Sequence, residues 1–211
     1  MSGIMLSLVG STYSNIPAIG SALGGGFFAG QISTAGNSIA DYNLVIGPKA
    51  SAQSGTNLQF KTSRTSDPGA TSVINGPANS ASMDDASHPA AQFCEGLTIG
   101  GFSDWYLPAK NELEVCYYNL KPTTTSNNTS YGTNANAVPA RASNYTAGTP
   151  AQTSASDFQT GNSEAFDSQR YWSSTESAAS SAFRQYFLTG DQFDYIKDGS
   201  LRVRAVRRVA V

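Results

Sequence analysis

The stretch GGFSDWYLPAKNEL at residues 100–113 indicates how the chain folds. Two glycines lead into a rigid Trp-Tyr-Leu-Pro run, and Pro108 then opens a helical pattern, as proline commonly does in a first helical turn. A large aromatic side chain between a Gly-Gly turn and a helix is usually buried. The corner is therefore compatible with a structural pin between two layers of the fold, with an active-site rim or with a binding platform.

The helix after this corner is predicted from residues 108–122, PAKNELEVCYYNLKP. Pro122 ends the pattern, because proline cannot continue a helix. The apolar residues at helical spacing, which we expect to be buried, are Leu113, Cys116, Tyr117 and Leu120.

Another helix is predicted before the corner, within residues 79–101 and closing at or before the two glycines. Pro89 suits its first turn, and Ser87 or His88 suits its N-cap. Its expected core stripe is Ala90, Phe93, Cys94 and Leu97.

The residue types that often carry catalysis are sparse. Asp84 and Asp85 are adjacent and point different ways, so we interpret them as charges near a helix N-terminus. No cysteine or aspartate stands at catalytic spacing from His88, which we expect to be a surface or capping residue. Cys94 and Cys116 are expected to be buried free thiols, with a disulfide between them as the open alternative. These patterns predict no catalytic residue, no metal and no cofactor.

Strand patterns lie toward both ends of the chain, at residues 26–33, 41–50, 56–63, 170–177, 181–190 and 200–211. In the last segment Leu201, Val203 and Ala205 alternate with Arg202, Arg204 and Val206. This alternation predicts a strand with one buried face and one face that is more exposed to water. Strands, two helices, long loops and strands again indicate the α+β class.

Two segments lack a clear period. Residues 1–25 carry no charge and end in LGGG, so we predict an N-terminal arm with a hinge that docks on a partner subunit, followed by one domain at residues 26–211. Residues 123–168 are predicted as long ordered loops, because Val138, Pro139 and Tyr145 suit packing against the body.

The composition limits the function. Only 13% of residues are charged and the net charge is −2, which argues against nucleic-acid binding. The apolar run IMLSLVG is too short to cross a bilayer, and no basic residue precedes it as in a signal peptide. We therefore expect synthesis in a cytoplasm, without membrane insertion.

Several signatures together resemble the DUF1566 family, also called the Lcl C-terminal domain family. They occur in the family's order at Cys94, residues 100–108, residues 112–113, residues 172–175 and residues 203–207. The family is similar to C-type-lectin-like domains, which implies two helices packed on short antiparallel sheets with long loops. Its members occur in bacterial surface proteins and in virion proteins of tailed phages.

The resemblance implies structural roles for the signature residues. Trp105 and Leu107 become pins that join the helix layer to the sheet, and Trp172 becomes a further buried pin. Asp104 caps a turn or pairs with an arginine. Arg204 and Arg207 are expected to pair with Asp104 or Glu112, with solvated strand arginines as the alternative.

The resemblance also bears on activity. Related formylglycine-generating enzymes need reactive cysteines near the C-terminal end, and none is present there, so this enzymatic hypothesis ranks lowest. The Glu-Pro-Asn, Gln-Pro-Asp and Trp-Asn-Asp tripeptides of calcium-dependent lectins are absent as well. We therefore expect a non-enzymatic protein without a calcium site.

The remaining hypothesis is a binding surface near the C-terminal turns, built from aromatic, amide and charged side chains. The candidate residues are Arg184, Tyr186, Asp191, Gln192, Phe193, Asp194 and Tyr195. The leading function is a phage virion protein, in the tail fibre or as capsid decoration, that adheres to a host-surface glycan or protein. Its arm would hold other virion subunits, in an expected homotrimer. The alternative is a bacterial surface-associated glycan-binding module.

Overall fold

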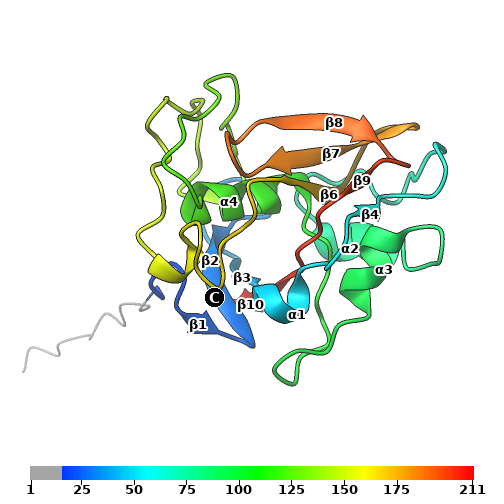
Figure 1. The fold of residues 1–211 in the computed structure, drawn as a ribbon, viewed down its shortest axis with the longest axis horizontal. Coiled ribbons are helices and arrows are strands. Elements are labelled where there is room, and N and C mark those ends of the chain that lie inside the picture. Colours follow the sequence, from blue (N-terminus) through cyan, green and yellow to red (C-terminus); the bar gives the residue numbers. More distant parts are fainter. Residues whose placement is uncertain (1–15) are drawn as a thin grey trace, which may run out of the picture.

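Strands from both ends of the chain share one antiparallel sheet, which we name the terminal sheet (Figure 1). The computed structural model describes residues 16–211. The strand order is β1–β2–β3–β10, and β5 pairs with β2 beside this path. The strands are β1 (Ala22–Leu23), β2 (Gly26–Ile32), β3 (Tyr42–Ile46), β5 (Ala137–Val138) and β10 (Val206–Ala210). The strands predicted within residues 26–33 and 41–50 are therefore confirmed.

The predicted arm requires a correction where the structure describes it. Residues 1–15 lie outside the described part of the chain. Strand β1, however, pairs with β2, and Gly24 and Gly25 form the turn between them with φ values of 51° and 82°. These positive φ values suit glycine, which has no Cβ to clash there. The glycine run is thus a hairpin turn within the terminal sheet, and the expected hinge at this position was wrong.

A second antiparallel sheet, which we name the outer sheet, follows the order β6–β7–β8. Its strands are β6 (Arg170–Ala178), β7 (Ser181–Tyr186) and β8 (Gln192–Ile196). The strand predicted at residues 170–177 is confirmed, and the strand predicted at residues 181–190 is confirmed as far as Tyr186, after which the chain turns. The pattern at residues 56–63 gives only the short strand β4 (Leu58–Gln59), which pairs with β9 (Ser200–Leu201).

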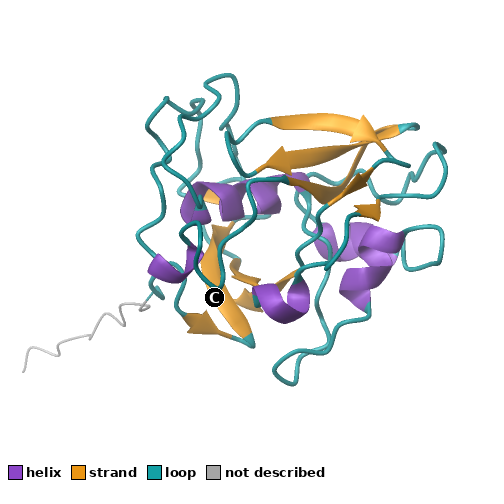
Figure 2. Ribbon diagram, viewed as in Figure 1, coloured by secondary structure: helices purple, strands orange, loops and turns teal. Residues whose placement is uncertain are grey.

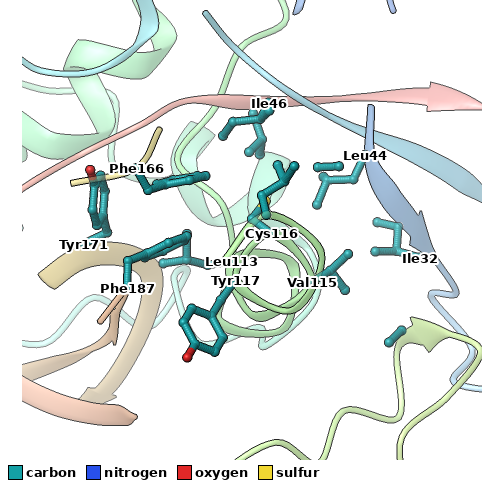
Figure 3. Close-up of a cluster of buried hydrophobic side chains, with 14 of the residues drawn as sticks. Ile32, Leu44, Ile46, Leu113, Val115, Cys116, Tyr117, Phe166, Tyr171 and Phe187 are labelled. Carbon is teal, nitrogen blue, oxygen red and sulfur yellow. The ribbon is translucent and has the colours of Figure 1, made fainter. Parts of the chain in front are cut away.

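Helix α4 (Lys110–Leu120) packs against β2 of the terminal sheet and against β6 and β7 of the outer sheet. Figure 3 shows side chains of the terminal sheet and of the outer sheet around the helix. The predicted stripe of α4 is buried and belongs to one hydrophobic core. Its main members are Ile32, Leu44, Ile46, Leu113, Val115, Cys116, Tyr117, Leu120, Phe166, Tyr171 and Phe187.

The helix predicted within residues 79–101 is in fact two short helices, α2 (Gly76–Ala81) and α3 (Pro89–Glu95). The Asn75 side chain accepts from the Ala78 N–H and caps α2. Pro89 begins α3 as predicted, and His88 occupies the N-cap position without a capping hydrogen bond from its side chain. Together with α1 (Lys49–Ala52), these helices cover a second core.

The corner around Trp105 has the predicted structural role. Gly100 and Gly101 turn the chain with φ values of 63° and 83°, which glycine adopts without strain. Trp105 and Leu107 are fully buried in the second core, and the indole Nε1 of Trp105 donates to the Phe102 carbonyl at 3.1 Å. Trp172 is buried in the same core. The interpretation of Trp105, Leu107 and Trp172 as pins is confirmed.

The C-terminal arginines differ in part from the predicted pairing. Arg207 binds both oxygens of Asp104, at 2.7 and 2.9 Å, as predicted. Glu112 instead pairs with Arg208 at 2.8 Å.

Arg204 pairs with Glu164 at 2.8 Å and is buried, so the predicted wetter face of the last segment was wrong. Bridges from Arg204 to Gln53 and from Arg202 to Tyr171 show that this segment runs between other parts of the fold.

The chain is therefore a mixed α/β protein with few helices and curled antiparallel sheets joined by long ordered loops (Figure 2). Residues 123–168 contain β5 and the short helix η1 (Ser156–Phe158), and Tyr145 packs into the core as predicted. Of the helices described, none has the length and apolar character needed to cross a bilayer.

Candidate functional site

Strand β8 lies at the edge of the outer sheet and exposes large apolar side chains. Phe193 is 50% exposed, Tyr195 43% and Ile196 37%, in contrast to the scattered single apolar residues elsewhere on the surface. Exposed apolar residues that lie together on a monomer often mark an interaction site. The edge of β8 is thus the most prominent surface for recognition.

The predicted site residues divide into two groups. Phe193, Asp194 and Tyr195 are exposed on β8, as a binding surface requires. Asp191 is instead buried and pairs at 2.7 Å with the half-buried Arg184, so neither residue offers a free charge to a ligand.

The other two predicted residues are also engaged within the protein. The Gln192 side chain donates to the Lys110 carbonyl at 2.9 Å, which ties β8 to the start of α4. Tyr186 is partly buried and lies 4.6 Å from the Arg170 guanidinium. The structure thus brings all seven predicted site residues to the β7–β8 hairpin, but only residues on β8 are exposed.

Tyr131 is a neighbour of this surface that the sequence analysis missed. Its ring meets that of Phe193 edge-to-face, with centroids 5.2 Å apart. The Asn128 N–H donates to the Thr189 carbonyl at 2.7 Å, so the long loop lies against the β7–β8 turn. Figure 1 shows this loop on the side of the molecule where β7 and β8 meet. Tyr131 lies 62 residues before Phe193, and no local pattern joins them.

Glu114 of α4 holds the long loop in place from inside the protein. Its side chain is buried and accepts from the Asn134 amide and the Tyr145 hydroxyl, each at 2.5 Å. It also pairs with Arg141. Burial raises the pKa of Glu114, although Arg141 and these donors favour the ionised form. A buried carboxylate adds little net stability, so we interpret its role as positioning the loop.

Lys121, which follows α4, fixes the same loop farther along. Its buried ammonium donates to the Asn127 side chain at 2.7 Å and to the carbonyls of Thr125 and Pro150. The Tyr117 hydroxyl also donates to the Asn127 side chain, at 2.6 Å. Residues 123–150 are therefore held by buried polar groups at two points of α4.

The surface formed by residues 16–211 has several hollows, and three of them have volumes of about 310 to 380 Å³. One of about 330 Å³ is formed by Tyr118 of α4 and by residues 141–149 of the long loop. Another of about 310 Å³ contains Lys49, Asp167 and Arg202, of which Asp167 and Lys49 are already paired at 2.8 Å. The last, of about 380 Å³, lies beside the Trp105 corner and is lined by Tyr42, Asn75, Pro77, Asp104, Tyr106 and Arg208.

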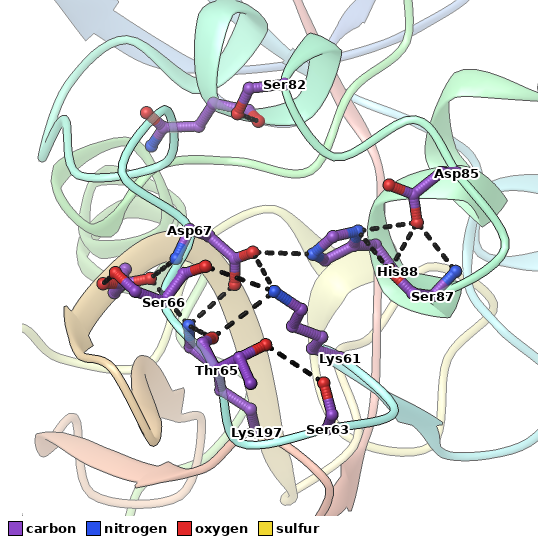
Figure 4. A network of polar contacts seen from close by, with 12 residues as sticks. Lys61, Ser63, Thr65, Ser66, Asp67, Ser82, Asp85, Ser87, His88 and Lys197 are labelled. Atoms are coloured by element: carbon purple, nitrogen blue, oxygen red, sulfur yellow. Dashed lines mark hydrogen bonds and ion pairs between the residues drawn. The ribbon is translucent and has the colours of Figure 1, made fainter.

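His88 stands at the N-cap position of α3, as one of the two predictions had it, but it does not lie on the surface. Its side chain is buried, with Nε2 3.0 Å from Asp67 and Nδ1 2.9 Å from Asp85 (Figure 4). Asp85 also accepts from the Ser87 backbone and hydroxyl, which, together with His88, lowers the pKa of Asp85 to about 2. Asp85 therefore orders the turn before α3 and does not act as a helix N-terminal charge.

Asp67 is the centre of this polar cluster. It pairs with Lys61 at 2.5 Å and with Lys197 at 2.7 Å, and Lys197 also pairs with Glu176 at 2.6 Å. Burial opposes ionisation of Asp67 and Glu176, but the donors around them outweigh it and lower the pKa of both carboxyl groups. The cluster joins segments that are far apart in the sequence, and it is not part of any of the three pockets.

This lowered pKa predicts a pH-dependent effect of Asp67→Asn. The folded-state pKa lies below the unfolded value of about 3.9. The stability that ionised Asp67 contributes is therefore fully present above that value and is lost as the pH falls through the folded-state pKa. Urea unfolding at a series of pH values should show a wild-type advantage over Asp67→Asn at pH 7 that shrinks below about pH 4. An advantage that stays constant down to pH 2 would contradict the ionised state of Asp67.

Cys94 and Cys116 are free and buried, as predicted. Burial raises the pKa of both thiols, which keeps them protonated and unreactive. Within residues 16–211, no group of three or more His, Cys, Asp or Glu side chains has the arrangement needed to hold a metal ion.

Comparison with known protein families gives a match. The family model of the Lcl C-terminal domain matches residues 53–207, which include the Trp105 corner, α4 and the outer sheet. No match was found among curated proteins. The matched range is well over half of the chain, and it begins later than residue 26, the expected start of the domain.

Proposed function

Because the chain belongs to the Lcl C-terminal domain family, we propose that it is a non-enzymatic recognition module with a C-type-lectin-like fold, displayed on a phage virion for adhesion to a host surface. Many copies on one particle would make weak single contacts effective, since linked binding sites raise the effective concentration. In this proposal the N-terminal residues attach the domain to other virion subunits, and the assembly is a homotrimer.

The main support is the division between the family signatures and the exposed surface. Trp105 and Trp172 are buried in the core, and Asp104 is occupied by Arg207. Phe193 and Tyr195 are exposed on β8 beside a loop that α4 holds in place. Aromatic side chains of this kind supply much of the binding energy at recognition surfaces.

The proposal predicts the result of replacing the β8 aromatic residues. The variant Phe193→Ala/Tyr195→Ala should lose about thirtyfold or more in adhesion to host cells, since aromatic residues at the centre of an interface contribute about 2 kcal/mol or more. Each substitution should cost at most about 1.5 kcal/mol of folding stability, because both residues are exposed. Phe193 loses its contacts with Tyr131 and the Arg184 guanidinium. Tyr195 loses a tilted contact with Trp172. Binding of fluorescently labelled protein to cells, together with urea unfolding, measures both effects.

The matched control is Ile39→Ala, which removes an exposed apolar side chain away from β8. It should leave adhesion unchanged. Adhesion that survives the double substitution on β8, or that falls equally with Ile39→Ala, would contradict a recognition surface at this edge.

The virion setting is tested separately. Mass spectrometry of purified virions should find the protein, and its genome neighbours should encode capsid or tail proteins. Neighbouring secretion genes and absence from virions would favour the bacterial surface-associated glycan-binding module.

A further inference from the structure

The pocket between α4 and the long loop has the size and lining of a small-molecule site. Its volume of about 330 Å³ lies at the lower end of the usual range of roughly 300–1,000 Å³. The lining combines two aromatic side chains with short hydroxyl and amide side chains. The lining residues are Tyr118, Arg141, Ala142, Ser143, Asn144, Tyr145, Thr146 and Thr149.

The wall of this pocket is held from behind by Glu114. This buried carboxylate binds Asn134, Arg141 and Tyr145, and the last two residues line the pocket. Such support keeps a binding site in one geometry before the ligand arrives. Burial of the Glu114 carboxylate has a cost in desolvation free energy. We interpret the role of this carboxylate as ordering the wall of the pocket.

The electrostatics of the pocket favour an uncharged ligand. Arg141 is the only ionisable side chain of the lining apart from the two tyrosines. Glu114 neutralises it, and its guanidinium lies over the Tyr118 ring at 4.0 Å. An anionic ligand would therefore meet a paired guanidinium, and a cationic ligand would meet no free carboxylate.

Several polar groups of the pocket are available to a ligand. Within the described residues 16–211, the side chains of Tyr118, Ser143 and Asn144 make no hydrogen bond to the protein, and Ser143 and Asn144 are exposed. Hydroxyl and amide groups both donate and accept hydrogen bonds, as do the hydroxyl groups of a sugar. Tyrosine adds an apolar body that can pack against the C–H groups of a sugar ring.

We infer that this pocket binds one neutral pyranose unit of a surface glycan, with hydrogen bonds from Ser143 and Asn144 and an apolar contact from Tyr118. The inference rests on the proposed recognition function and names the class of its ligand. The Tyr131–Phe193 contact, and the Tyr145 N–H that donates to the Tyr131 carbonyl at 2.6 Å, link the pocket to β8. The aromatic edge of β8 would then contact neighbouring parts of the same glycan or its carrier.

Saturation-transfer NMR with free monosaccharides tests the inference. The neutral probes are glucose, galactose, mannose, N-acetylglucosamine and N-acetylgalactosamine at millimolar concentration, and the acidic probes are glucuronic acid and N-acetylneuraminic acid. At least one neutral sugar should receive saturation from the protein. The variant Ser143→Ala/Asn144→Ala should weaken its binding by about tenfold, as for the loss of one or two hydrogen bonds.

The matched control is Asn57→Ala/Ser163→Ala, which removes one exposed amide and one exposed hydroxyl outside the pocket. It should bind the sugar as the wild type does. The inference is wrong if no neutral sugar binds, if only acidic sugars bind, or if the pocket variant and the control bind alike.

Cell adhesion measured on the same proteins separates the two proposals. Wild-type adhesion without binding of any neutral sugar would overturn the pocket inference and leave the proposed function standing. Sugar binding that depends on Ser143 and Asn144, in a protein that does not adhere to host cells, would support the pocket and contradict the proposed adhesion.

Discussion

Replacement of Trp105 by alanine is expected to lower the free energy of unfolding by about 3–5 kcal/mol, the range for removing a large aromatic side chain from a core. Trp105 is fully buried in the second core, and Gly47 lies close to its ring. The substitution would leave a cavity between α1, the corner and the last strand segment, and would also remove the hydrogen bond to the Phe102 carbonyl. Urea unfolding followed by circular dichroism measures the loss.

A matched control lies in the same corner. Phe102 is 37% exposed, and its ring contacts the Arg207 guanidinium at 3.9 Å. Phe102→Ala should therefore cost about 1 kcal/mol, as for the loss of a partly exposed cation–π contact. An unchanged melting temperature in Trp105→Ala would contradict its role as a pin and return the corner to the candidates for a binding site.

The second large effect is expected from Asp67→Ala, at about 3–5 kcal/mol. Asp67 accepts hydrogen bonds from Lys61 and Lys197, and the Lys197 side chain is fully buried. Removal of the carboxylate leaves buried ammonium groups with less compensating charge, which is much more costly than the loss of an exposed pair. Thermal and urea unfolding at pH 7 measure the effect.

The control for this prediction is Asp198→Ala. Asp198 pairs with the exposed Arg64 at 2.9 Å, and exposed pairs contribute about 0–1 kcal/mol. Equal losses from the two substitutions would show that water reaches the Asp67 cluster and that its charges are not held in a buried network.

The parts of the fold that the sequence predicts are those with a local pattern. The stripe of α4 follows from helical spacing, and the burial of Trp105 follows from its place between two glycines and a helix. The burial of Trp172 followed from the family resemblance. Burial of Glu114 and Arg204 could not be predicted in this way. Periodicity assumes one buried face, but α4 lies between two sheets and Arg204 lies in a segment covered on both sides.

The sequence did not predict the Asp67 cluster, for a different reason. Lys61, Asp67, His88, Glu176 and Lys197 come from separate segments, and only the tertiary fold brings them together. His88 therefore looks isolated in the sequence although its ring lies between two carboxylates.

The candidate site was predictable in part. The exposed β8 residues follow from their position near the last turns. The pairing of Arg184 with Asp191 had a signal, because long side chains of opposite charge reach each other at diagonal positions across a hairpin, and Arg184 lies opposite Phe193. The pocket beside Tyr118 had none, since residues 141–149 lack a period and meet Glu114, Tyr117 and Tyr118 of α4 only in the tertiary fold.

The central claim is that the family signature residues, such as Trp105 and Trp172, support the fold, and that the ligand binds elsewhere on the surface. Amide chemical-shift mapping tests this claim most directly. An isotopically labelled sample would be titrated with glycan fragments prepared from the host envelope. The account predicts that the shifted resonances cluster on β8 and on residues 131–149, with Trp105 and Trp172 unaffected. Shifts centred on the Trp105 corner and Arg208, with β8 unchanged, would contradict it.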